Sequence, residues 1–284
     1  MIDSVRPFSQ VDVFTDQLTA GNPVAVVHDA DGLSDEAMAA VASWTNLSET
    51  TFLLPPTDPG AAYRLRIFTP RTELPFAGHP TLGSARAWLE AGGVPRDPSG
   101  PVQECGVGLV RLRSSGGRLA FAAPPLRRSG PVDEADVDTL VRGLGLDRTA
   151  VRDAAWVDNG PGWVALLLPD AATVLGLEPD LRALAANEVS RAVGVVGAHP
   201  AGDEAAFEVR AFVPAMGVGE DPVTGSLNAG LGRWLVDAGH APSSYVAAQG
   251  TRLGRRGRVH VEHADGQVWV GGWTVPGVVG SIAV

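Results

Sequence analysis

The chain has 284 residues, of which 45% are hydrophobic and 19% are charged, enough to bury the core of one large domain or two ordinary ones. Its formal net charge of -10 disfavours nucleic acid and anionic membranes as partners, because like charges repel. No lysine is present, which excludes a lysine Schiff base. The single cysteine, Cys105, excludes an internal disulfide and a multi-thiolate metal site.

The N-terminal residues contain no apolar core of signal-peptide length. No apolar run approaches the roughly 18 residues that a membrane-spanning helix requires. We therefore expect a soluble cytoplasmic protein with no membrane partner.

The sequence of the first half predicts two strands separated by a helix, then a third strand and a glycine-rich helix. "GNPVAVV" at 21–27 is typical of a turn leading into a strand, and a helix is expected near Ser34–Trp44. "NLSETTFLL" at 46–54 runs into a second apolar strand, and "RIFTP" at 66–70 is a short strand ending at proline. A helix near Thr81–Ala91 and a hairpin turning at Gly116–Gly117 follow.

The second half repeats this order. "NGPGWVALLLP" at 159–169 precedes a helix expected near Glu178–Ala186, and "RAFVP" at 210–214 matches "RIFTP". "GEDPVTGSLNAGLGRWLVDAGH" from Gly219 matches "LPFAGHPTLGSARAWLEAGG" from Leu74, and a final hairpin is expected to turn at Asp265–Gly266. Because the matches keep their order at a spacing of about half the chain, they predict a duplicated α+β module.

We place the first α/β half at residues 1–124 and the second at 125–284. A last strand near 275–284 is expected to cross over to the first half.

Each repeated glycine-rich helix is expected to begin at a proline. Pro80 and Pro222 suit the first helical position, where a missing N–H costs nothing, so His79 and Asp221 are the expected N-cap residues. Ala, Gly and Ser dominate both helices, which lets a sheet curl closely round them. Free N–H groups at the two helix starts favour an anion, so the duplication predicts one cleft shared by both halves.

Glu49 in "NLSETTFLL" is the candidate acid/base residue. An arbitrary glutamate is usually a solvated loop carboxylate, but the following "TTFLL" indicates a strand that enters the core. Partial burial at the end of a strand raises the pKa of a carboxyl group towards the range that suits proton transfer.

These motifs, together with "AAQGTRLGRRG" at 247–257, strongly resemble the PhzF-like isomerases, from Val11 to the last strands. The resemblance implies the diaminopimelate epimerase fold. In this α+β fold, two pseudo-symmetric halves each form a curled, mostly antiparallel sheet around a central helix. It also implies a homodimer and no metal or organic cofactor.

The resemblance further implies a proton shift between carbons of trans-2,3-dihydro-3-hydroxyanthranilate or another small carboxylate-bearing substrate. Glu49 matches the family's proton-shuttling glutamate, and we expect His79 and Asp221 to be catalytic beside it. The expected substrate-binding residues are Gly78, Ser84, Gly225 and Ser226.

Two positions depart from the family pattern. Leu227 stands where alanine is most common, and Gly162 stands where the phenazine enzyme has a bulkier basic residue. Both are expected to line the cleft and to influence the choice of substrate. The alternatives to an isomerase are an epimerase or racemase acting at one carbon, and a non-catalytic protein that binds a small carboxylate.

Overall fold

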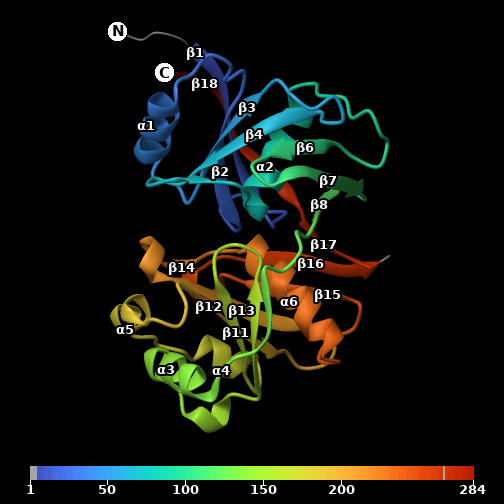
Figure 1. Cartoon of the computed structure of the whole chain (residues 1–284). Coiled ribbons are helices and arrows are strands. Elements are labelled where there is room, and N and C mark those ends of the chain that lie inside the picture. Colours follow the sequence, from blue (N-terminus) through green and yellow to red (C-terminus); the bar gives the residue numbers. More distant parts are fainter. Residues whose placement is uncertain (1–4, 265) are drawn as a thin grey trace. The chain divides into compact units, whose positions relative to one another are not determined.

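The computed structural model describes residues 5–264 and 266–284. The chain divides into two compact units (Figure 1). The first unit ends at Ala122 and resumes at Gly271–Val284, and the second is Ala123–Val270. The predicted division at 124 lies beside this boundary, and the predicted last strand corresponds to β18 (Thr274–Ala283), which belongs to the first unit.

The sheet of the first unit follows the order β18–β1–β2–β3–β4–β6–β7. Only the pairs β2–β3 and β4–β6 are parallel, so the sheet is mostly antiparallel as predicted. Its other strands are β1 (Val5–Val13), β2 (Asn22–Val27), β3 (Thr50–Leu54), β4 (Tyr63–Phe68), β5 (Glu73–Leu74), β6 (Val102–Cys105), β7 (Gly108–Ser115) and β8 (Arg118–Ala122).

Helix α2 (Gly78–Glu90) is the central helix of the first unit, and strands β1, β2, β3, β4, β8 and β18 all contact it (Figure 1). The sheet approaches it closely because the helix carries small residues. A Cβ atom at Gly83 would lie only 2.2 Å from Cγ1 of Val24. The predicted reason for the Ala, Gly and Ser composition is therefore confirmed.

Helix α1 (Asp35–Thr45) contacts β3 and β4 and closes a separate hydrophobic cluster that includes Met38, Phe52 and Phe68. The predicted start is confirmed, because the hydroxyl group of Ser34 accepts a hydrogen bond from the backbone N–H of Ala37. Asn46 ends the helix in the left-handed region, at φ 54°, and turns the chain toward β3.

The second unit repeats the plan, with the strand order β9–β10–β11–β12–β13–β15–β16. Its parallel pairs, β11–β12 and β13–β15, occupy the same places as those of the first unit. The strands are β9 (Arg128–Pro131), β10 (Asp153–Asp158), β11 (Trp163–Leu167), β12 (Ala192–Ala198), β13 (Phe207–Val213), β14 (Val218–Asp221), β15 (Ser244–Gln249), β16 (Gly257–Ala264) and β17 (Gln267–Gly272), which ends past the boundary.

Helix α6 (Gly225–Asp237) corresponds to α2 and contacts β10, β11 and β16. It also depends on glycine, because a Cβ atom at Gly230 would lie 2.3 Å from the carbonyl oxygen of Val157. The remaining helices are α3 (Glu134–Leu144), α4 (Ala171–Leu175), α5 (Leu181–Ala186), which is the predicted helix near Glu178–Ala186, and the short 3₁₀ turns η1 (Arg148–Ala150), η2 (Pro214–Met216) and η3 (Thr251–Leu253).

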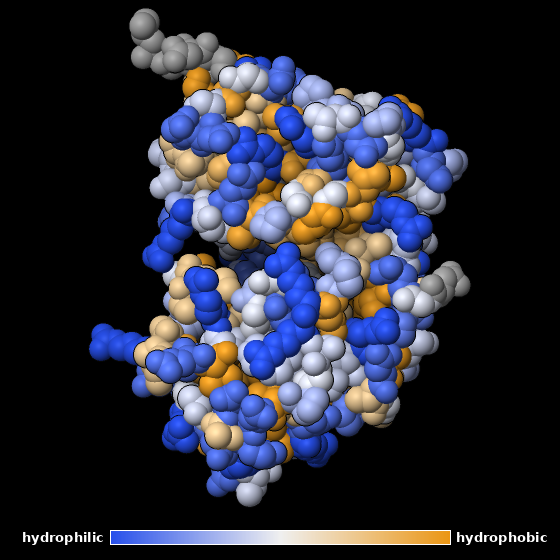
Figure 2. Space-filling model, in the orientation of Figure 1, coloured by the Kyte–Doolittle hydropathy of each residue, from blue (hydrophilic) through white to orange (hydrophobic). Residues whose placement is uncertain are grey.

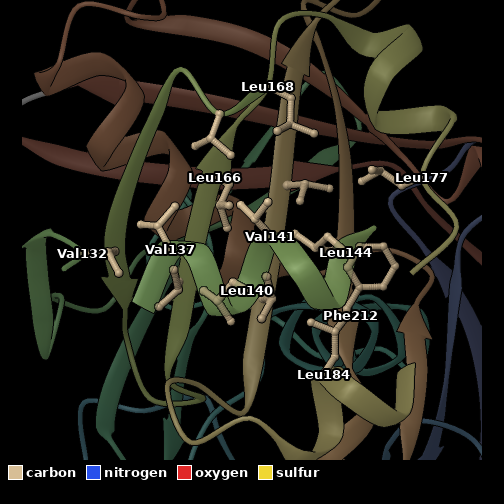
Figure 3. Close-up of a cluster of buried hydrophobic side chains, with 14 of the residues drawn as sticks. Val132, Val137, Leu140, Val141, Leu144, Leu166, Leu168, Leu177, Leu184 and Phe212 are labelled. Carbon is tan, nitrogen blue, oxygen red and sulfur yellow. The ribbon is translucent and has the colours of Figure 1, made fainter. Parts of the chain in front are cut away.

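A hydrophobic cluster of the second unit lies between α3 and strands β11–β13 (Figure 3). Leu140 and Leu144 of α3 pack toward Leu166 of β11 and Phe212 of β13, and all four are nearly or fully buried. This cluster stabilises the face of the sheet opposite α6.

The same ion pair recurs in both units. Arg66 of β4 binds Glu73 of β5, and Arg210 of β13 binds Glu220 of β14. Each guanidinium group also lies 5.0 Å from the ring centre of a phenylalanine two residues later in its strand. The duplication predicted from "RIFTP" and "RAFVP" thus extends to side-chain contacts.

The first predicted hairpin is confirmed, since Ser115 of β7 pairs with Arg118 of β8 across Gly116–Gly117. For the second hairpin, Asp265 lies outside the described residues. Blue, hydrophilic residues cover much of the molecular face in Figure 2, in keeping with the charged composition. Within residues 5–264 and 266–284, no helix combines the length and the apolar character needed to cross a bilayer.

Candidate active site

Glu49 lies where its sequence context places it, immediately before β3. Its side chain is 15% exposed, so it is partly but not completely withdrawn from water. The neighbouring Thr50 is buried, and its hydroxyl group lies 2.6 Å from that of Thr45 at the end of α1. These contacts hold the short segment that carries Glu49 between a helix end and a core strand.

Glu49 meets His79 within the first unit. Oε2 of Glu49 lies 3.3 Å from Nε2 of His79, and the histidine side chain is only 5% exposed. His79 is the second residue of α2, so the contact joins the start of β3 to the start of the central helix. The structure therefore brings together two of the three residues predicted to be catalytic.

His79 is held in its neutral form. Burial lowers its pKa to about 3, and a hydrogen bond with the backbone of Pro23 opposes this only in part. A neutral imidazole has one protonated and one unprotonated ring nitrogen. The neutral ring therefore lies beside the Glu49 carboxyl group without adding a charge to the site.

The other side of the His79 ring faces "GNPVAVV". Nδ1 of His79 lies 3.3 Å from Nδ2 of Asn22, and Asn22 is fully buried at the start of β2. The preceding residue, Gly21, leaves no room for a side chain, because a Cβ atom would lie 2.2 Å from the carbonyl oxygen of Val13. The motif thus places a short polar segment in contact with His79. Periodicity in the sequence does not reveal this role.

The start of α2 differs from the prediction. Ala77, not His79, is the N-cap residue, and its side chain makes no capping bond. Pro80 is the third helical residue rather than the first. Proline is tolerated there because no N–H group of the first turn has a partner within the helix. The backbone N–H groups of Gly78 and His79 are therefore the ones without a partner inside the helix.

Ser84 is placed deeper than a substrate-binding role requires. Its side chain is fully buried in α2, and its hydroxyl group lies 2.8 Å from that of Thr51 in β3. This contact favours a structural role that ties the central helix to the sheet.

Asp221 is not the N-cap residue of α6, contrary to the prediction. It is the last residue of β14 and pairs with Ala211 of β13, while Thr224 is the N-cap residue. The hydroxyl group of Thr224 donates a hydrogen bond to Oδ2 of Asp221 at 2.5 Å. Pro222 lies before the N-cap, so it marks the turn into the helix rather than the first helical position.

Ser226 occupies in α6 the position that His79 occupies in α2, directly after the first helical glycine. Its hydroxyl group accepts a hydrogen bond from Nε1 of Trp163 at 3.0 Å, and its carbonyl oxygen accepts one from Nδ2 of Asn159 at 2.8 Å. Gly225 is the first helical residue, so its N–H group, like that of Gly78, has no partner within the helix.

Leu227 does not line a cleft, which corrects the prediction. It is fully buried and packs against β12, where a Cβ atom at Gly194 would lie 2.5 Å from Cδ1 of Leu227. Gly194 thus provides the room that the larger side chain needs. Gly162 adopts φ +90°, and its N–H group donates to Oδ1 of Asp158. A turn in this left-handed region favours glycine, which explains why no side chain stands there.

Sequence reasoning missed three polar residues around the predicted site. Asn22 contacts His79, Thr224 donates to Asp221, and the buried Gln249 at the end of β15 bonds to Thr224. Gln249 lies in "AAQGTRLGRRG", a motif that carried the family resemblance without indicating which residue in it matters.

The sequence and the fold of this chain match those of known proteins. The family model for the phenazine biosynthesis-like proteins, PhzC-PhzF, matches residues 11–278. The chain is 37% identical over 282 residues to the Schizosaccharomyces pombe protein named antisense-enhancing sequence 1, covering 93% of this chain and 94% of that protein. It is 36% identical over 256 residues to trans-2,3-dihydro-3-hydroxyanthranilate isomerase of Pseudomonas aeruginosa, covering 88% and 87%.

A solved structure shows the same fold. The crystal structure of a PhzF-family phenazine biosynthesis protein from Enterococcus faecalis matches with a TM-score of 0.82 at 26% identity, and covers 99% of this chain and 100% of that one. With a matching family model and isomerase relatives along most of its length, the chain belongs to the phenazine biosynthesis-like family and is an isomerase.

Proposed function

We propose that the chain moves a proton between two carbon atoms of a small carboxylate-bearing substrate, with Glu49 as the acid/base. The observation that supports this most strongly is the contact of 3.3 Å between Glu49 and the buried, neutral His79. A carboxylate with a neutral imidazole in hydrogen-bond range can take up a proton and release it without separating charge.

The proposed reaction removes one proton from the substrate and returns one proton to it. Ionised Glu49 removes a proton from one carbon, and the electron pair of that C–H bond moves into the conjugated system of the substrate. The protonated Glu49 then delivers a proton to a second carbon, and the double bond shifts. His79 stays neutral beside the protonated Glu49 while the substrate is the anion.

We propose that a helix start binds the substrate carboxylate. The N–H groups of Gly78 and Gly225 have no partner within their helices, and the dipole at a helix start favours negative charge. Neither α2 nor α6 has a side chain bound at its N-cap, so nothing of that kind competes for these groups. We include Ser226 as a substrate-binding residue and Asp221 as a catalytic residue, as the family resemblance implies.

The lead candidate substrate is trans-2,3-dihydro-3-hydroxyanthranilate. It is the compound named for the relative from Pseudomonas aeruginosa, which is 36% identical to this chain. The proton chemistry does not depend on this identification, since another conjugated acid could use the same groups.

The experiment is an incubation with trans-2,3-dihydro-3-hydroxyanthranilate in deuterated water, followed by NMR. A product with a moved double bond supports the isomerase. Deuterium at a single inverted stereocentre would instead identify an epimerase or racemase. Tight binding with neither turnover nor exchange at carbon would identify a binding protein and contradict the proposal.

Two glutamate-to-glutamine variants separate an effect on the reaction from an effect on folding. Glu49→Gln should slow conversion by about 10²- to 10⁴-fold, because the amide cannot accept the proton. Glu90→Gln alters an exposed glutamate that pairs with Arg86 on the same unit, and should convert substrate like the wild type. Equal rates for the two variants would remove Glu49 from the mechanism.

We also propose that the protein is cytoplasmic and, as the family resemblance implies, a homodimer. Gel filtration at micromolar concentration should then show a species of about twice the 29.4 kDa chain. A single peak at the monomer mass would contradict the dimer.

A further inference from the structure

A buried glutamine organises the turn that carries Asp221. Gln249 is fully buried at the end of β15. Its Oε1 accepts hydrogen bonds from the backbone N–H of Thr224 at 3.0 Å and from Nδ2 of Asn228 at 2.9 Å. Its Nε2 donates to Oγ1 of Thr224 at 2.9 Å and to the carbonyl oxygen of Asp221 at 3.2 Å. One amide group therefore binds both ends of the segment from Asp221 to Thr224.

The direction of these bonds is fixed by chemistry. A backbone N–H group can only donate, so the Gln249 atom that faces the N–H of Thr224 must be the carbonyl oxygen Oε1. Nε2 therefore faces the hydroxyl group of Thr224 and donates to it. The single hydroxyl proton of Thr224 is then left to point at Oδ2 of Asp221, at 2.5 Å. That distance falls in the range of about 2.5–2.7 Å for bonds from a hydroxyl group to a carboxylate.

The hydroxyl group of Thr224 bonds to Asp221 instead of capping its own helix. A threonine at an N-cap usually accepts a hydrogen bond from an N–H group in the first turn. Ser34 and Asp180 make such bonds at the starts of α1 and α5, whereas Thr224 makes no side-chain capping bond at α6. Its hydroxyl group is occupied by Gln249 on one side and Asp221 on the other.

We propose that Gln249 is a positioning residue for Asp221 and acts through the hydroxyl group of Thr224. Gln249 orients the hydroxyl so that it can only donate to Oδ2, which fixes the direction of the carboxylate. The effect on turnover rests on the proposed function of Asp221, whereas the direction of the hydrogen bonds stands independently of it.

The first unit offers a matched control. Gln103 is also fully buried, and its Nε2 donates to the hydroxyl group of Thr81 in α2 at 3.1 Å. The same substitution, glutamine to glutamate, can therefore be made in two buried amide-to-threonine pairs, of which only the pair with Gln249 leads to a predicted catalytic carboxylate.

The test that needs no substrate is NMR of the labelled full-length protein in mixtures of H₂O and D₂O. The carboxyl carbon of Asp221 should show an H/D isotope shift transmitted from the Thr224 hydroxyl. Thr224→Ser should keep the shift, and Thr224→Val should lose it. Gln249→Glu, at about pH 9 where the introduced group is ionised, should reduce it because Thr224 then donates to the new carboxylate. Gln103→Glu should leave it unchanged. An identical isotope shift in the wild type and Thr224→Val would overturn the proposal.

Kinetics then test the consequence for turnover. Thr224→Val should lower kcat/KM by about 10- to 100-fold, the usual effect of one hydrogen bond to a charged group, and Thr224→Ser should recover most of it. In an Asp221→Asn background, Thr224→Val should cause no further loss, because its effect passes through the carboxylate. Independent, multiplying losses would overturn the positioning role. Absence of turnover even in the wild type would count against the proposed function, while the isotope shift still decides the inference.

Discussion

The first turn of α2 and the first turn of α6 have the same backbone plan. Both helices contain 13 residues and begin at a glycine. The next residue is His79 in the first unit and Ser226 in the second, so only one unit presents a ring that can hold a proton. The comparison teaches that a duplicated backbone can carry different side chains at the same helical position.

The support behind these two positions also recurs. Asn22 lies behind His79, and Asn159 binds the carbonyl oxygen of Ser226. Both asparagines come from a glycine- and proline-containing turn that leads into the strand beside the helix. The repeat therefore extends to the residue that supports the second helical position, although the bonds differ.

The largest expected difference between the units concerns the shared ion pair. The side chains of Arg210 and Glu220 are 5% and 11% exposed, against 22% and 42% for Arg66 and Glu73. Glu220→Gln should lower the free energy of unfolding by about 3–5 kcal/mol, because it leaves a buried guanidinium group uncompensated. Glu73→Gln should cost at most about 1 kcal/mol, since its pair is partly solvated and Asp35 still binds Arg66.

Urea denaturation of both variants at pH 7 measures this difference. Equal losses would show that the two pairs are energetically equivalent despite their different burial.

The second prediction concerns Leu227, which departs from the family pattern and packs against Gly194. Gly194→Ala should destabilise the protein by about 1–3 kcal/mol, because the added methyl group overlaps Cδ1 of Leu227. Combining it with Leu227→Ala should cost less than the sum of the two single changes, because each relieves the other. Gly280→Ala is the control, since a Cβ atom there meets nothing within 4 Å. Additive losses in the double variant would contradict the proposed fit between Gly194 and Leu227.

A third effect, which depends on pH, separates His79 from Ser226. The pKa of His79 is about 3 in the folded protein against 6.5 for the free side chain. Between these two pH values, His79 is protonated in the unfolded chain and neutral in the folded one. Stability is therefore full above about pH 6.5 and falls as the pH drops toward 3, by up to about 1.4 kcal/mol per pH unit. His79→Gln should flatten this slope and Ser226→Ala should not. Thermal unfolding between these pH values would show an unchanged slope in both variants if His79 were charged in the fold.

Much of the fold could be predicted because local residues encode it. "RIFTP" and "RAFVP" carry an arginine that pairs in the same way in both units, and the small residues of α2 and α6 reflect close contact with a sheet. The partial burial of Glu49 was also predictable, since the apolar run after it indicates a core strand.

The register of the helix starts was not predictable in the same way. Proline is tolerated throughout the first turn and just before it, so Pro80 and Pro222 do not mark equivalent positions. His79 consequently corresponds to Ser226 rather than to Asp221. The burial of Leu227 against Gly194, and the bonds of Gln249, depend on segments far apart in the chain, which no local pattern reveals.

The most direct test of the account compares Glu49→Gln with Ser226→Ala on trans-2,3-dihydro-3-hydroxyanthranilate or any substrate found to turn over. The account predicts that Glu49→Gln lowers kcat by about 10²- to 10⁴-fold, the usual contribution of an acid/base group, while Ser226→Ala mainly raises KM. A Glu49→Gln variant that keeps a rate near that of the wild type would contradict the claim that the first unit moves the proton.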